Sequence, residues 1–216
     1  MIRTTILLII LAGSAFADTL TLDTLPLETS GTGPFTIDFQ FDSGALGGSN
    51  NTVTLTDFLL GGGSIGSSPT SVTGGVSSTT SPFSVSLTTV SSFYNDIEFA
   101  FTPGSSLSFD ISSTTNVDPV APDTFTFAIF DGTGNEIPTT NPNLYDSFFE
   151  LDLPGPSSPV TTITSGSAGY SADIAAPTYT SGPAGGGSVV PEPSALPLIG
   201  MAGAILVGLR LRKGRP

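Results

Sequence analysis

The sequence predicts an all-β protein: an antiparallel β-sandwich with jelly-roll or Greek-key-like connections, spanning residues 18–180. Three observations lead to this fold class. Apolar and polar residues alternate over several short segments, turn residues separate these segments, and no stretch of this body shows a convincing 3.6-residue period. Short strands with frequent turns are typical of two-layer β folds. High Gly, Pro, Ser and Thr content leaves disorder as an alternative, but the regular alternation favours a folded domain.

The first element is a predicted signal peptide, residues 1–17. Arg3 gives a short positive start, residues 6–11 form an apolar run, and Ala15 and Ala17 make a small-x-small cleavage site before Asp18. This order of charge, apolar core and small residues is typical of secretory signal peptides. A short buried helix is the alternative, and it explains neither the charge nor the alanine spacing.

Five segments of the body alternate most clearly, and each is expected to be a strand with one buried face. Phenylalanine recurs on the buried faces, and each well-buried large side chain contributes roughly 2 kcal/mol, so these residues can support a core without disulfides. The polar partners, among them Glu150 and Asp152, are expected to face solvent. The predicted inner positions are Phe35, Ile37, Phe39 and Phe41; Ile97, Phe99 and Phe101; Leu107, Phe109 and Ile111; Phe125, Phe127 and Ile129; and Phe149, Leu151 and Leu153.

Residues 61–75, GGGSIGSSPTSVTGG, interrupt this pattern. Glycine, serine and proline dominate them, and they lack an apolar alternation. They are therefore predicted to be a long mobile insertion rather than a pair of strands.

The charge distribution excludes several classes of function. The formal net charge is −13, all 18 acidic residues lie between Asp18 and Glu192, and no Lys, Arg or His occurs between Arg3 and Arg210. Such a body repels phosphate backbones, so no nucleic-acid partner is expected. Because the body also lacks cysteine, Ser–His and Cys–His nucleophile pairs, Schiff bases and ordinary zinc sites are excluded. Carboxylate chemistry alone remains.

The chain closes with a predicted linker, residues 181–190, and a tail, residues 191–216. Residues 195–209 form an apolar run that as a helix would span about 22 Å, enough to cross a locally thinned bilayer. The positive-inside rule would keep the following cations in the cytoplasm, where they stop translocation. These cations are Arg210, Arg212, Lys213 and Arg215.

Pro191, Glu192 and Pro193, followed by the apolar run and the basic end, resemble the PEP-CTERM sorting signal of Gram-negative bacteria. The resemblance implies recognition by an exosortase, a membrane-embedded protease, and a link to exopolysaccharide or biofilm. A plain single-span anchor is the alternative. Four body stretches are similar to a group of PEP-CTERM proteins of unassigned function, which implies a secreted β-rich domain. They are GPFTIDFQF, GSNNTVTLTDF, SSFYNDIEFAFTPGSSLSFDIS and FDGTGNEIPTT.

Candidate chemistry in the body is sparse. Asp131, Asn135 and Glu136 are weak candidates for calcium, the one cofactor considered, but their spacing departs from an EF-hand and favours a hairpin turn. The pairs Asp96/Glu98 and Glu150/Asp152 each share a strand face, as solvated surface carboxylates commonly do. No catalytic residue and no metal site is assigned. The possible sugar-stacking residues are Tyr94, Tyr145, Tyr170 and Tyr179.

We therefore expect a protein exported across the inner membrane of a Gram-negative bacterium, held briefly in the membrane by its tail, and then placed on the cell surface or outside the cell. Its expected partners are an exosortase, the membrane before processing, and exopolysaccharide. A structural or interaction role without enzymatic activity fits best. A carbohydrate-binding module and a carboxylate-dependent glycosidase are the alternatives.

Overall fold

The computed structural model describes most of the body of the chain. The predicted signal peptide up to Phe16, the sorting motif Pro191–Pro193, the apolar run and the basic tail lie outside the described residues. Among the residues that are described, no helix is both long and apolar enough to cross a membrane. The described residues are 17–30, 32–44, 51–90, 92–116, 121–143, 145–155 and 158–182.

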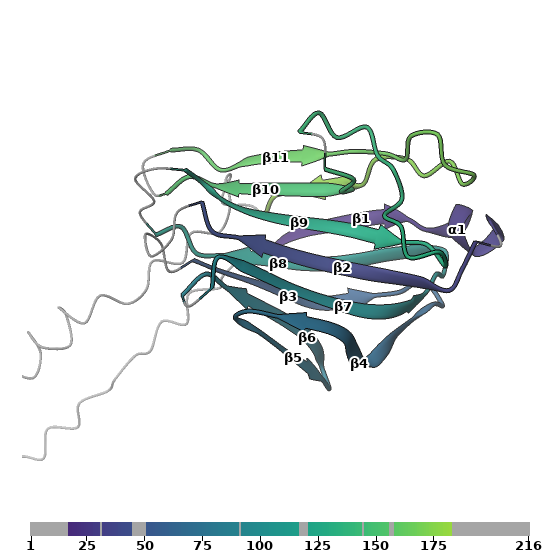
Figure 1. Ribbon diagram of the computed structural model, residues 1–216, viewed down its shortest axis with the longest axis horizontal. Coiled ribbons are helices and arrows are strands. Elements are labelled where there is room, and N and C mark those ends of the chain that lie inside the picture. Colours follow the sequence, from purple (N-terminus) through teal and green to yellow (C-terminus); the bar gives the residue numbers. More distant parts are fainter. Residues whose placement is uncertain are drawn as a thin grey trace, which may run out of the picture.

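These residues form two six-stranded antiparallel sheets (Figure 1) and one short helix, α1 (Leu25–Ser30). Sheet A has the order β12-β1-β8-β3-β6-β5, and sheet B has the order β11-β10-β9-β2-β7-β4. The predicted all-β class with antiparallel sheets is confirmed. The strands are β1 (Asp18–Asp23), β2 (Phe35–Asp42), β3 (Thr52–Leu59), β4 (Ser64–Thr73), β5 (Val76–Thr80), β6 (Phe83–Thr88), β7 (Tyr94–Thr102), β8 (Ser106–Ser113), β9 (Asp123–Phe130), β10 (Phe149–Leu153), β11 (Thr161–Thr164) and β12 (Thr178–Thr180).

The two sheets share one apolar core, and the five predicted strands supply most of it. All the predicted inner positions are buried, as the alternation requires. Aromatic rings join the sheets: Phe39 of β2 lies 5.6 Å from Phe109 of β8, and Phe83 of β6 lies 5.1 Å from Phe99 of β7, each pair edge to face. Such contacts add to the burial of apolar area and hold the two layers together.

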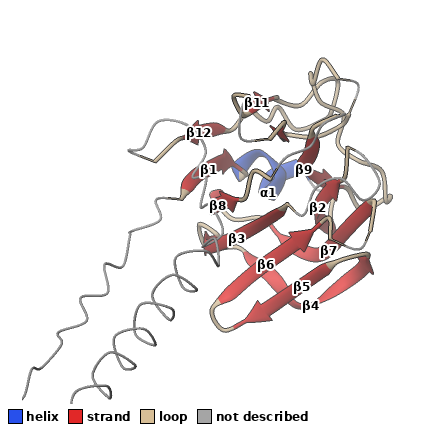
Figure 2. Cartoon of the chain, turned by 90° about the vertical axis from the view of Figure 1, so that its left-hand side faces the viewer, coloured by secondary structure: helices blue, strands red, loops and turns tan. Residues whose placement is uncertain are grey.

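The strand pairings follow a simple rule from β1 to β8. β1 pairs with β8, β2 with β7 and β3 with β6, all antiparallel. These are the pairings of one long two-stranded ribbon folded over on itself. Its turn lies at Gly74 and Gly75, between β4 and β5, and Figure 2 shows these two strands side by side at one end of the molecule.

The prediction that residues 61–75 form a long mobile insertion is wrong. Most of it forms β4, which pairs with β7 along the edge of sheet B, with irregular register around Pro69. Most β4 side chains are exposed, so this strand carries no alternation that a sequence pattern could reveal. Its stability comes from pairing with a long, buried neighbour.

Both ends of the body lie together in sheet A. β12 pairs with β1, with Thr19 opposite Thr180, and the Gly182 amide donates a 2.9 Å hydrogen bond to the Asp18 carboxylate. The first strand begins at Asp18, directly after the predicted cleavage site at Ala17. The two predicted sorting segments therefore attach to neighbouring points of the folded body.

Candidate functional site

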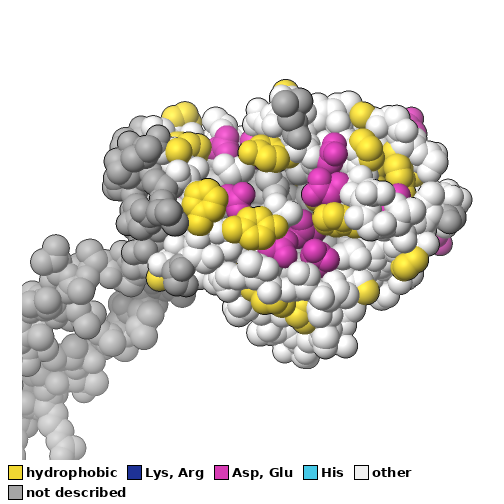
Figure 3. All heavy atoms as spheres, in the orientation of Figure 1, with side chains coloured by type: hydrophobic (Ala, Val, Ile, Leu, Met, Phe, Trp, Pro, Cys, Tyr) yellow, Lys and Arg dark blue, Asp and Glu magenta, His cyan; other side chains and the backbone are white. Residues whose placement is uncertain are grey.

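The outer face of sheet B carries four carboxyl groups on two adjacent strands, which we call the acidic cluster. Asp38 and Asp42 come from β2, and Asp96 and Glu98 come from β7. The register places Asp38 opposite Glu98. Side chains that are opposite or diagonal across two antiparallel strands lie close together, so the four groups form one cluster. Figure 3 shows acidic and hydrophobic side chains side by side on the face that it presents.

Asp38 is the most unusual member of the acidic cluster because it is only 1 % exposed although it lies on an outward face. Its Oδ2 accepts a 2.5 Å hydrogen bond from Gln40 Nε2, but its Oδ1 has no donor. Burial, together with a hydrogen bond and the negative charge of Asp96, raises the pKa of Asp38 to about 9. This raised pKa favours the protonated form of Asp38 next to the charge of Asp96.

The pKa values of Asp42 and Glu98, two other members of the acidic cluster, are also raised. Burial, and then the charge of Asp96, raises the pKa of Asp42 and that of Glu98 above their usual values. Asp42 Oδ1 is buried and has no hydrogen-bond donor. Burial and Asp96 also raise the pKa of Tyr94, which remains 40 % exposed at the edge of the cluster. No described residue is a Lys, Arg or His, so no side chain offers these groups a positive partner.

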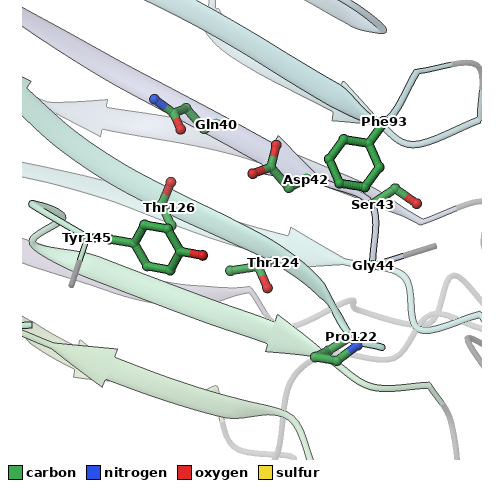
Figure 4. A pocket seen from close by; sticks show the side chains of 9 residues that line it. All are labelled: Gln40, Asp42, Ser43, Gly44, Phe93, Pro122, Thr124, Thr126 and Tyr145. Carbon is green, nitrogen blue, oxygen red and sulfur yellow. The ribbon is translucent and has the colours of Figure 1, made fainter. Parts of the chain in front are cut away.

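A pocket of about 190 Å³ opens beside the acidic cluster, and we call it the stacking pocket. Phe93 and Tyr145 lie on opposite sides of it, and Figure 4 shows the side chains of β2 and β9 between the two rings. Phe93 is 49 % exposed and Tyr145 is 57 % exposed. Asp42 belongs both to this pocket and to the acidic cluster. The lining residues are Gln40, Asp42, Ser43, Gly44, Phe93, Pro122, Thr124, Thr126 and Tyr145.

Hydrogen bonds to Asp123 connect the segments at one edge of the stacking pocket. Asp123, at the start of β9, is fully buried and accepts hydrogen bonds from the Gly44 amide at 2.9 Å, from Asn51 Nδ2 at 3.0 Å and from Thr89 Oγ1 at 3.1 Å. These contacts join the end of β2 to the segments before β3 and after β6. Asp123 therefore holds Gly44 in place at the edge of the pocket.

Glu150 and Asp152 on β10 were expected to face solvent, and Glu150 does not. Glu150 is buried, not solvated, because Asn141 Nδ2 and Asn143 Nδ2 donate to its carboxylate at 3.1 Å and 2.5 Å. Asp152 accepts from Thr124 Oγ1 at 2.8 Å and from Thr161 Oγ1 at 3.2 Å. Both side chains are engaged in contacts that hold neighbouring segments against the sheet.

The weak calcium candidates lie in a turn after β9. Asp131 Oδ1 accepts hydrogen bonds from the Thr133 amide at 2.9 Å and from its hydroxyl at 2.6 Å, and the hydroxyl bond is the main reason why the pKa of Asp131 is lowered. Asn135 Nδ2 donates to Thr133 Oγ1, while Glu136 lies in a β-bridge with Phe130. Within the described ranges, no three acidic side chains are arranged to hold a metal ion.

Two of the four tyrosines are accessible for stacking. Tyr94 and Tyr145 are exposed. Tyr170 donates to Thr32 Oγ1 at 2.7 Å, and Tyr179 donates to the Asp18 carboxylate, so both are partly buried in structural contacts. Sequence reasoning missed Phe93 because it treated phenylalanine as core. Its position directly before the strand at Tyr94, outside the alternation, was the available signal.

No protein-family model, no curated protein and no solved structure matches this chain significantly. The functional assignment therefore depends on the chemistry of the sequence and of the outer face of sheet B.

Proposed function

We propose that the chain is an exported cell-surface or extracellular-matrix protein, sorted by an exosortase-type system, with a structural or binding role and no enzymatic activity. The observation that carries this proposal is the tripartite tail: Pro191-Glu192-Pro193, an apolar run and a basic end, combined with a signal peptide and a body free of cations. The paired β1 and β12 support it, because both sorting segments can be removed without cutting a strand.

Intact mass spectrometry of the protein from the cell surface and from the medium tests this route. The expected mature chain begins at Asp18 and lacks the apolar run and basic end of residues 195–216. Replacing Pro191, Glu192 and Pro193 with alanine should leave the tail uncut, whereas the control Pro197→Ala, inside the apolar run, should be processed normally. A full-length product that is soluble inside the cell would contradict the proposal.

We further propose that the strands are connected as a jelly roll. The pairings β1–β8, β2–β7 and β3–β6 support this because a jelly roll is a two-stranded ribbon wrapped into two sheets. In this chain β5 joins sheet A through β6, so the end of the ribbon is divided between the sheets. Lectin domains use this architecture, which is an analogy of fold and not evidence of activity.

Carbohydrate binding is the second candidate function, and the stacking pocket is the observation that favours it. Sugar rings stack their apolar faces on aromatic side chains, and polar side chains between the rings orient the hydroxyl groups. Phe93 and Tyr145 supply the rings, and Gln40, Thr124 and Thr126 supply the polar groups. The volume of the pocket is below the usual range for enclosed ligands, so it would hold a small part of an extended chain.

The carboxyl groups of the body support a glycosidase activity less well than carbohydrate binding. Hydrolysis requires two carboxyl groups about 5 to 9.5 Å apart on either side of a bound sugar. Asp38 and Asp96 instead lie on neighbouring strands of one sheet face, where Asp96 raises the pKa of Asp38, and Glu150 and Asp152 are held in structural contacts. We therefore propose binding without hydrolysis.

A further inference from the structure

We propose that the stacking pocket binds an amino sugar with a free, protonated amine, so that the polysaccharide recognised by this protein is cationic. The proposal rests on the carbohydrate-binding function proposed above and adds the charge of the sugar. The positive group would lie against Asp42, at the boundary between the stacking pocket and the acidic cluster.

The stacking pocket borders carboxyl groups that no basic side chain of the described residues neutralises. Asp42 lines the pocket, its Oδ1 is buried without a donor, and Asp38, Asp96 and Glu98 lie on the same face. A half-buried carboxyl group without a positive partner is costly to ionise, and the described chain contains no basic side chain that could neutralise it. An ammonium group bound in the pocket would bring the missing positive charge next to the Asp42 carboxyl group.

The lining of the stacking pocket suits an organic cation better than a metal ion. Calcium takes 6–8 oxygen ligands, and in the described part of the chain no three acidic side chains are arranged around one metal position. Aromatic rings, in contrast, lie on both sides of Asp42 in Figure 4. Rings attract organic ammonium groups through their negative faces and also stack on sugars, so an amino sugar uses both the carboxylate and the rings.

The carboxyl groups on this face disfavour acidic polysaccharides. A uronic-acid polymer would bring carboxylates to a face that already carries four carboxyl groups and no cation. Like charges at short range disfavour such a complex. An N-acetylated sugar could still stack on Phe93 and Tyr145, but it would leave the Asp42 carboxyl group without a charged partner.

Isothermal titration of the full-length chain, in a detergent without a sugar headgroup and at about 0.15 M salt, tests the proposal. The probes are a short glucosamine oligomer, its N-acetylated counterpart, an oligouronate, spermidine and calcium chloride. We expect the glucosamine oligomer to bind most tightly. Asp42→Asn should weaken this binding by about tenfold or more, because it removes the charged partner.

Two control variants separate the pocket from general attraction to an acidic protein. Asp110→Asn makes the same change of charge on β8 of the other sheet and should alter the affinity less than about twofold. Replacing Phe93 and Tyr145 with alanine should weaken binding of the glucosamine oligomer more than binding of spermidine, because only the sugar also stacks on the two rings.

The remaining outcomes overturn the proposal in distinguishable ways. Equal affinity for the acetylated oligomer would remove the charge requirement and leave carbohydrate binding intact. Calcium binding without any sugar binding would overturn both and indicate a metal site. Equal losses in Asp42→Asn and Asp110→Asn, with spermidine as tight as the sugar, would reduce the effect to nonspecific electrostatics.

Discussion

At the scale of single residues, Asp38 makes the stability of the protein depend on pH. Its folded-state pKa of about 9 lies well above the ordinary value of an aspartate, so the folded protein holds a proton that the unfolded chain releases. This contribution to stability is fully present below the unfolded pKa and is lost as the pH rises through the folded pKa. The raised pKa values of Asp42, Glu98 and Glu136 act in the same direction.

We therefore expect the melting temperature to fall as the pH is raised from about 5 to 9. The free energy of unfolding should decrease by up to about 1.4 kcal/mol per pH unit for one proton. Asp38→Asn should flatten this slope, because an amide does not titrate while its oxygen can still accept from Gln40. Thermal unfolding followed by circular dichroism across the pH range measures both effects. An unchanged slope in the variant would assign the dependence to other groups.

The position of Asp38 was predictable and its environment was not. The alternation in β2 correctly places Asp38 on the face opposite Phe39, but it also implies contact with water. Its acidic neighbours on β7, Asp96 and Glu98, come beside it only through the strand register, which no periodic pattern specifies. Phe93 and Tyr145 likewise lie outside regular alternation, so no periodic pattern could place them at one pocket.

At the scale of elements, the ring cluster joining the sheets dominates stability. Phe39 is fully buried and contacts Phe58, Phe109, Phe125 and Phe127 at centroid distances of 5.6–6.5 Å. Phe39→Ala should lower the free energy of unfolding by about 3–5 kcal/mol, because it leaves a cavity that the surrounding side chains fill only partly. Denaturant unfolding measures the loss. Phe93→Ala is the matched control and should stay within about 0.5 kcal/mol.

The turn between β4 and β5 depends on a glycine. Gly74 has a φ of +78°, and an added Cβ would lie 2.3 Å from the Tyr94 carbonyl oxygen. Gly134 has a similar φ of +79° but open space around it. Gly134→Ala should cost about 1–2 kcal/mol of backbone strain, and Gly74→Ala should cost about 1–3 kcal/mol more because the backbone must shift. Equal losses in denaturant unfolding would show that the turn can move freely.

The strands that the sequence pattern revealed are those with one face in the core. β2, β7, β8, β9 and β10 each place apolar residues at every second position, because one side of each strand meets the other sheet. β4, β11 and β12 lie at sheet edges, expose many side chains and are rich in Ser and Thr. Hydrogen bonds to a neighbouring strand define these edge strands, and such pairing leaves little trace in composition.

At the scale of the whole molecule, charge repulsion should make stability depend on salt. The described body has acidic side chains but no basic ones, so added salt screens repulsion and breaks no ion pair between side chains. The melting temperature at neutral pH should therefore rise between about 0.01 M and 0.15 M sodium chloride. A fall over this range, in the same thermal unfolding measurement, would contradict this account.

In the export route proposed here, the pairing of β1 with β12 would also set the order of events. β12 covers one edge of β1, and Gly182 holds the Asp18 carboxylate, so sheet A is complete only after the last residues of the body have followed the first. A protease that trims the tail must act beyond Gly182 to leave this closure intact. Premature cutting would strip a strand from the sheet and expose the backbone of β1 as a template for association between neighbouring molecules.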